Sequence, residues 1–134
     1  EWTLAAYHIV KKKLLTTDAG NPDLTQQVGQ QSSNGLEASL KLQLPQDWTL
    51  TANAAFVRAR YDQFDQSVAG VAVSRDGNTP VGVPKRTANL WLDKQLGSAL
   101  QLGGGLRYVD SRYADIANTR ELPAYTVADA SLSW

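Results

Sequence analysis

Polar and apolar residues alternate with a period of two through most of the chain. Residues 36–44 place leucine and alanine at every second position, and residues 48–56 repeat the pattern after a short break. The polar positions between them are Glu37, Ser39, Lys41 and Gln43, then Thr49, Thr51 and Asn53. Because successive side chains of a strand point to opposite faces, both stretches predict strands with one apolar and one polar face.

The same criterion predicts six strands joined by connections of alternating length. Tight turns fall at Pro45–Asp47 and Gly97–Ser98, and longer connections cover Asp18–Thr25, Gln63–Val83 and Ala114–Leu122. The predicted strands are residues 2–17, 26–44, 48–62, 85–96, 100–113 and 123–134. Short turns at one rim and long loops at the other are typical of an up-and-down barrel. The strands are also long, roughly 12 to 18 residues against a usual length of about 5 to 6. The predicted fold class is therefore all-β, with antiparallel up-and-down strands.

The apolar face is poor in bulky side chains, and this indicates whether a second sheet or lipid covers it. A sandwich core needs interdigitating volume at close packing, whereas a face turned to lipid needs only to be apolar. Trp48 begins a strand beside a tight turn, and Tyr61, Tyr108 and Tyr113 lie toward the long connections. Aromatic residues at strand ends are typical of the two interfaces of a bilayer. A membrane barrel with a polar lumen is favoured, and a soluble β-sandwich binding module stays open as an alternative.

Composition removes several classes of function. Lys plus Arg and Asp plus Glu both number 13, cysteine is absent and histidine occurs once, at His8. A balanced charge gives no support to nucleic-acid binding, and this residue set supports neither a zinc-thiolate nor a polyhistidine metal site. No apolar run approaches the roughly 18 residues of a transmembrane helix. The chain starts and stops in strand-like sequence without a secretory signal, so we expect it to be an internal segment of a longer protein.

Five motifs in order along the chain resemble the later barrel strands of TonB-dependent siderophore receptors. They are "GLE" from Gly35, "WTLTAN" from Trp48, "VPKRTANLW" from Val83, "GGGLRYV" from Gly103 and "LPAYTVADA" from Leu122. The resemblance covers nearly the whole chain and is weakest in residues 3–15 and 63–83.

The resemblance implies a segment of a 22-stranded barrel in the bacterial outer membrane, importing ferric siderophores with energy from TonB. The chain would supply about six strands near the C-terminal end, without the plug domain or the final strands. The ferric siderophore would be the transported ligand, with no resident cofactor. Tight turns would then be periplasmic and long loops extracellular. An outer-membrane porin or outer-membrane enzyme is the alternative within the membrane class.

Candidate site residues follow from phase and from the resemblance. Catalytic residues are not predicted, since Gly103–Gly105 lacks the Gly-Lys-Ser/Thr that completes a phosphate loop. The polar-face carboxylates Glu37 and Asp129 are expected to have structural partners. A ferric siderophore would be held by aromatic and cationic side chains near the long loops. The predicted ligand-binding residues are Tyr61, Phe64, Lys85, Arg107 and Tyr113.

Two further partners are expected. The basic residues Lys11–Lys13, Arg58 and Arg60 could meet lipopolysaccharide phosphates at the loop-side rim. Six strands cannot close a barrel, so the isolated segment has two unpaired edges and an uncovered apolar face. We expect the isolated segment to self-associate.

Overall fold

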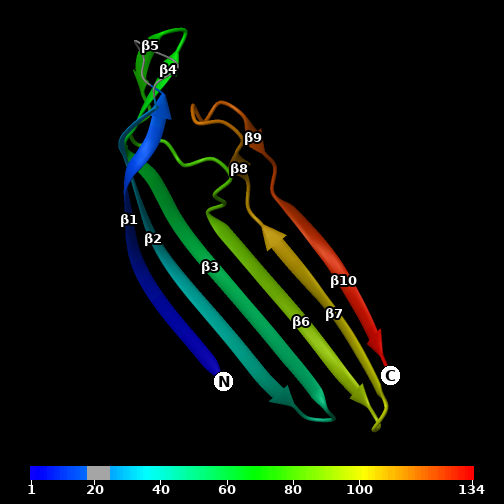
Figure 1. Cartoon of the computed structure of the whole chain (residues 1–134). Coiled ribbons are helices and arrows are strands. Elements are labelled where there is room, and N and C mark those ends of the chain that lie inside the picture. The colour runs from blue at the N-terminus through cyan, green and yellow to red at the C-terminus, as the bar shows by residue number, and fades with distance from the viewer. Residues whose placement is uncertain (18–24) are drawn as a thin grey trace.

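The computed structural model describes residues 1–17 and 25–134, which form one long antiparallel sheet with two small hairpins at one end (Figure 1). Its strand order is β1-β2-β3-β6-β7-β10, so each long strand pairs with the next long strand along the chain. The bounds are β1 Trp2–Thr17, β2 Thr25–Leu44, β3 Trp48–Gln63, β6 Arg86–Leu96, β7 Leu100–Val109 and β10 Tyr125–Ser133. The predicted all-β, up-and-down arrangement is confirmed. Of the predicted connection Asp18–Thr25, residues 18–24 lie outside the described residues, and Thr25 is the first residue of β2.

Strand register aligns the alternating pattern into continuous rows. Leu36 is opposite Phe56, and Phe56 is opposite Arg86, so the alternating apolar positions 36–44 of β2 and 48–56 of β3 share one face with Leu90 and Leu92 of β6. That face is open, with Leu36 53% exposed, Phe56 51% and Leu106 52%. Buried apolar side chains in the described part of the chain are few: Ala59, Tyr61 and Phe64.

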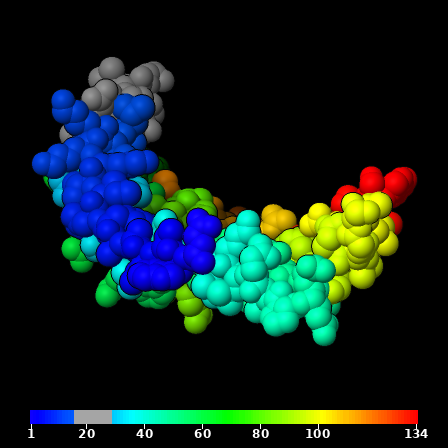
Figure 2. All heavy atoms as spheres, turned by 90° about the horizontal axis from the view of Figure 1, so that it is seen from below, coloured from blue at the N-terminus to red at the C-terminus, as the bar shows by residue number. Residues whose placement is uncertain are grey.

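The sheet is a single curved layer, and Figure 2 shows it as an arc seen along the strands. Side chains diverge on the outer side of an arc and converge on its inner side. The exposed leucines and Phe56 therefore belong to the outer face, and the opposite, polar row, in which Trp91 and Asp93 are half-buried, belongs to the inner face. A sandwich would need a second sheet on the apolar face. The described residues place no such sheet there.

The two tight turns have the predicted positions. In the first, Gln46 and Asp47 adopt φ of 61° and 59°, and in the second Gly97 adopts φ of 67°. Beside the first turn, the Lys94 ammonium lies 5.3 Å from the centre of the Trp48 ring and donates a hydrogen bond to the Gln46 carbonyl. This aromatic–cation pair marks the lower edge of the apolar face, as expected of an interfacial tryptophan.

The long connection after β3 contains structure that the sequence did not predict. Residues 65–74 form a hairpin of β4 (Asp65–Val68) and β5 (Val71–Ser74), which Figure 1 shows beyond the end of the sheet. Its two turn residues, Ala69 and Gly70, have φ of 50° and 80°, and positive φ at both positions matches the right-handed twist of the strands.

The fifth predicted strand is shorter than expected. β7 ends at Val109, and Asp110 and Ser111 separate it from the two-residue β8 (Arg112–Tyr113), which pairs with β9 (Glu121–Leu122). The Asp110 carboxylate accepts hydrogen bonds from the Ser111 amide and the Tyr108 hydroxyl, both at 3.0 Å. The Asp110 amide still donates to the Arg86 carbonyl at 2.9 Å, but the Ser111 amide donates to the Asp110 carboxylate instead, and the regular strand ends here.

A glycine pair on β7 gives room for an aromatic side chain of the neighbouring strand. A Cβ placed on Gly103 would lie 2.8 Å from the Trp91 ring, and one on Gly105 would overlap that ring. The Trp91 indole N–H donates to Asp93 Oδ1 at 2.9 Å. Glycine at these two positions therefore leaves the space that the Trp91 ring of the neighbouring strand occupies.

Candidate functional site

Two loops at the long-loop end of the sheet are tied together by an asparagine that imitates backbone pairing. Asn118 accepts a hydrogen bond from the Thr79 amide at 2.8 Å and donates to the Thr79 carbonyl at 2.9 Å. Asn78 donates to the Ile116 carbonyl at 2.9 Å, and the Gly82 amide donates to the Tyr113 carbonyl at 2.9 Å. We call these four bonds the loop tie. It makes the connections after β3 and after β7 one assembly.

Asp115 organises the second of these loops from within. Its carboxylate accepts hydrogen bonds from the Thr119 amide and hydroxyl and from the Arg120 amide, the last at 2.7 Å. The bond from the Arg120 amide, followed by those from Thr119, lowers the pKa of Asp115 below its ordinary value. The carboxylate is thus kept charged in a turn whose amides it satisfies.

Tyr61 and Phe64, two of the predicted ligand residues, pack against each other. Their ring centroids are 4.7 Å apart with planes inclined by 24°, and each side chain is 8% exposed. The Phe64 amide donates to Asp76 Oδ1 at 2.8 Å, and a Cβ on Gly29 would lie 2.9 Å from the Phe64 ring. Burial raises the pKa of the Tyr61 hydroxyl, which lies beyond the apolar band of the sheet. In this structure the pair forms the foot of the β4–β5 hairpin, and a ligand contact for either residue stays a prediction.

Lys85 and Tyr113 lie at the base of the tied loops. Lys85 is exposed and lines a hollow of about 270 Å³ with Val57, Gly77 and Thr79 among its other walls. The backbone at both positions is fixed, since Lys85 accepts from the Val57 amide at 2.9 Å and Tyr113 accepts from the Gly82 amide. Lys85 therefore places a mobile cation on a fixed backbone beside the loops.

Arg107 lies lower on the polar face, apart from the other four predicted residues. Its Nη2 lies 3.2 Å from Asp129 Oδ2, with the two side chains 57% and 45% exposed. The structural partner expected of Asp129 is thus Arg107, whereas among the described residues the Glu37 side chain makes no hydrogen bond or ion pair. Both residues line a hollow of about 470 Å³ with Trp91 and Gly105. The ion pair is open enough for Arg107 to exchange its partner for an anion.

A second cluster, on the outer face, was not anticipated. Arg86 Nε donates to Asp110 Oδ2 at 2.8 Å, and the Tyr108 hydroxyl donates to the other carboxylate oxygen at 3.0 Å. The cluster lies where the apolar rows end toward the long loops. The sequence shows an arginine and a tyrosine at outward positions near strand ends. It does not show that Asp110 is their partner, because that depends on how the strands are paired.

The loop tie was also missed from the sequence, where Asn78 and Asn118 looked like ordinary loop residues. Their only local signal is that asparagine tolerates the left-handed region, where Asn118 lies with φ of 57°. The described residues contain no group of three or more His, Asp and Glu side chains placed to hold a metal ion. Nor does the described chain include a helix long and apolar enough to cross a membrane.

Fold and site together define a class of protein. A single curved sheet carries an apolar outer face, aromatic residues where that face ends, a polar inner face, tight turns at one end and ordered loops at the other. These are the properties of the wall of an outer-membrane β-barrel.

Comparison with known proteins identifies the family. The whole chain, residues 1–134, matches the family described as "TonB dependent receptor-like, beta-barrel". The chain belongs to this family, whose barrels lie in the outer membrane of Gram-negative bacteria.

Curated relatives agree with this assignment. The chain is 35% identical over 104 residues to the ferrioxamine receptor of Yersinia enterocolitica, a match that covers 78% of this chain and 14% of the relative. It is 31% identical over 136 residues to the ferrichrome outer membrane transporter/phage receptor of Escherichia coli, covering 98% of this chain and 17% of that protein. The chain thus spans less than a fifth of the length of these relatives.

A solved structure shows the same arrangement. The siderophore receptor PiuA of Acinetobacter baumannii superposes with a TM-score of 0.80 at 26% identity, covering 96% of this chain and 19% of the receptor. The antiparallel sheet is therefore a segment of a barrel.

Proposed function

We propose that this chain is part of the wall of an outer-membrane receptor that imports ferric siderophores with energy delivered through TonB. The observation that carries the proposal is the match of the whole chain to the TonB-dependent receptor barrel, with receptors of ferrioxamine and ferrichrome among the relatives. The substrate is proposed as a class, since these names cover different siderophores.

The wall would contribute to uptake without chemistry on the substrate. Its polar inner face would line the lumen around a plug domain, within a closed barrel of 22 strands. Lys85 and Tyr113 lie at the base of the loop tie, where an arriving ligand would first meet the barrel. Arg107 lies further down the lumen with a half-exposed ion pair, which suits a later contact.

Uptake of labelled ferric siderophores tests the proposal. The full-length receptor would be produced in a host whose own siderophore receptors are deleted, and ferrioxamine, ferrichrome and a catecholate complex would be supplied in turn. We expect uptake of at least one complex that stops when TonB is removed. Passive entry that is independent of TonB would instead support the porin alternative.

Charge-removing variants test the ligand residues. Lys85→Gln and Arg107→Gln are each expected to weaken binding of an anionic ferric complex by roughly three- to tenfold, as for the loss of one charge-assisted hydrogen bond. Lys94→Gln is the matched control, since Lys94 carries the same charge, lies beside the Trp48 ring at the tight-turn end of the sheet and lines neither the hollow of Lys85 nor that of Arg107. Unchanged affinity in both test variants would remove Lys85 and Arg107 from the binding site.

A further inference from the structure

Arg112 in β8 is a cation whose charge has no partner in the described part of the chain. Its Nη1 is buried and has no hydrogen-bond acceptor. The other two guanidinium nitrogens are not buried, and residues 1–17 and 25–134 provide no hydrogen bond or ion pair for them either. A guanidinium stays charged at physiological pH, and covering a charge without an acceptor is costly. The half-buried Arg112 side chain therefore has the properties of an anion site rather than of a structural contact.

The carboxylates nearest to Arg112 in the sequence are bound to other donors. Asp110 belongs to the cluster on the outer face, and Asp115 accepts from the amides of its own loop. Glu121 accepts a hydrogen bond from the Ser111 hydroxyl at 2.5 Å. None of these three carboxylates is bonded to Arg112. The anion that compensates Arg112 therefore comes from outside the described residues.

The Arg112 side chain is nevertheless held against an aromatic ring. Its Cζ lies 5.4 Å from the centre of the Tyr125 ring, within the range of a cation–π contact. The backbone of Arg112 pairs with Leu122 in the β8–β9 ladder, and the next residue, Tyr113, contributes its carbonyl to the loop tie. Tyr125 is 43% exposed, so its ring has surface left for a second contact. Arg112 and Tyr125 together form a pre-positioned cation beside an open aromatic surface.

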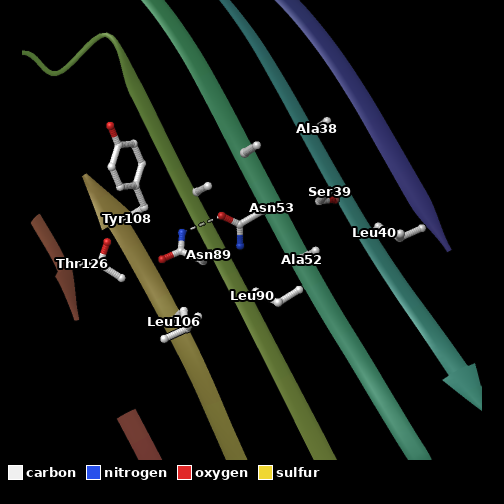
Figure 3. Close-up of a pocket in the computed structure, with 12 residues that line it drawn as sticks. Ala38, Ser39, Leu40, Ala52, Asn53, Asn89, Leu90, Leu106, Tyr108 and Thr126 are labelled. Carbon is white, nitrogen blue, oxygen red and sulfur yellow. Dashed lines mark hydrogen bonds between the residues drawn. The ribbon is translucent and has the colours of Figure 1, made fainter. Parts of the chain in front are cut away.

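Both groups belong to the inner face of the sheet, near the long loops. Thr126 is opposite Tyr108 beside the hollow drawn in Figure 3, which lies on the outer face. Neighbouring residues of a strand alternate between faces, so Tyr125 is on the inner face. Arg107 is on the inner face too, opposite the residue two positions further along β10, which is roughly 7 Å away. Arg112 and Arg107 thus place two cations one after the other along this face, with Arg112 nearer the loops (Figure 1).

We infer that Arg112 is a specificity-determining residue that selects ferric siderophores of net negative charge, with catecholate complexes as the preferred class. The accessible edge of its guanidinium donates to oxygen atoms of the ligand and receives the counter-charge that the described residues do not supply. The open part of the Tyr125 ring packs against a catechol ring. A ferric tris-catecholate is anionic, whereas a ferric trihydroxamate is uncharged and gains little from this cation. The inference rests on the proposed function, because it concerns the ligand of the same receptor.

The test compares two ferric complexes on the purified full-length receptor. A ferric tris-catecholate and ferrichrome, an uncharged trihydroxamate complex, would each be titrated while the tryptophan fluorescence of the receptor is followed. Arg112→Gln removes the charge, and Arg112→Lys keeps the charge without the planar guanidinium. Arg120→Gln is the matched control, because Arg120 is an exposed cation of the same connection.

We expect Arg112→Gln to weaken binding of the tris-catecholate by roughly ten- to hundredfold, as for a charge-assisted hydrogen bond, and to leave the affinity for ferrichrome unchanged. Arg112→Lys should recover part of the loss, and Arg120→Gln should bind as the unmodified receptor does. An unchanged affinity of Arg112→Gln for the tris-catecholate would overturn the inference, and so would an equal loss in Arg120→Gln.

Two further readouts separate the inference from its alternatives. Because Arg112 has no partner to lose, Arg112→Gln should not lower the thermal unfolding midpoint of the receptor. A lowered midpoint with unchanged affinity would mean that Arg112 pairs with another segment of the receptor, and the binding role would be refuted. Uptake of ferrichrome but not of the tris-catecholate would refute the inference and leave the proposed function intact, whereas a receptor that imports no ferric complex would refute both.

Discussion

Replacing Asn118 by alanine tests whether the loop tie couples the two loops. The change removes the bonds to the Thr79 amide and carbonyl, both below 3.0 Å, and places at φ of 57° an alanine, which tolerates the left-handed region less well than asparagine does. Each partly buried hydrogen bond contributes about 1 kcal/mol, and a left-handed alanine costs roughly 1 kcal/mol more. The tied state should therefore lose about 3 kcal/mol, which raises the open population of the loops about 150-fold.

Hydrogen exchange in the full-length receptor measures this opening. We expect faster exchange at the Thr79 and Gly82 amides, which donate across the tie, and also at the Thr119 amide in the opposite loop. Asn118→Gly separates the two contributions, because it loses the same bonds without the backbone penalty and should open the loops only about 30-fold.

A change at a distance from the tie provides the control. Ser67→Ala lies in β4 of the same long connection and should leave exchange at the tie unaltered. If Asn118→Ala accelerated exchange in residues 76–83 while residues 114–120 stayed as protected as before, the loops would be independent and the reasoning would be refuted.

Three other predictions concern packing, pH and assembly. Gly105→Ala should lower the thermal unfolding midpoint of the barrel, because overpacking against Trp91 costs about 1 to 3 kcal/mol. Gly104→Ala should leave the midpoint unchanged, since the nearest atom to its added Cβ is 3.8 Å away. Equal midpoints of the two variants would contradict this prediction. The lowered pKa of Asp115 means that its carboxylate stabilises the loop above about pH 4 and that this contribution is lost as the pH falls further. Pepsin cleavage of the loop should therefore rise below about pH 4 relative to Asp115→Asn, and identical pH profiles of the two proteins would sink the idea. The isolated 134-residue chain should sediment as oligomers in plain buffer and dissociate in detergent, because β1 and β10 are unpaired edges; a monodisperse monomer would count against it.

The β2–β3 hairpin could be predicted from sequence because its information is local. A period of two continues without a break on both sides of Pro45–Asp47. Because a shift of one residue would turn the apolar side chains to the polar face, this pattern determines both the pairing of the two strands and which face is apolar. The family motifs lie on these same long strands.

The loop-bearing end could not be predicted in the same way. The β4–β5 hairpin has strands of four residues, and its turn places Ala69 at positive φ without the usual Asn-Gly signal. The loop tie joins residues 39 positions apart, and nothing near Asn118 in the sequence points to Thr79. Of the five predicted ligand residues, phase correctly placed Arg107 on the polar face, but the burial of Tyr61 against Phe64 depends on the hairpin that was missed.

The length of β3 has a consequence for how the cell surface presents this protein. The apolar band of the strand ends at Phe56, and the strand continues for seven more residues to Gln63, which adds about 24 Å of strand beyond the apolar band. The β4–β5 hairpin stands at the top of that extension (Figure 1). An antibody raised against residues 65–74 should therefore bind intact cells. It would recognise a folded hairpin at the end of the extended strand pair.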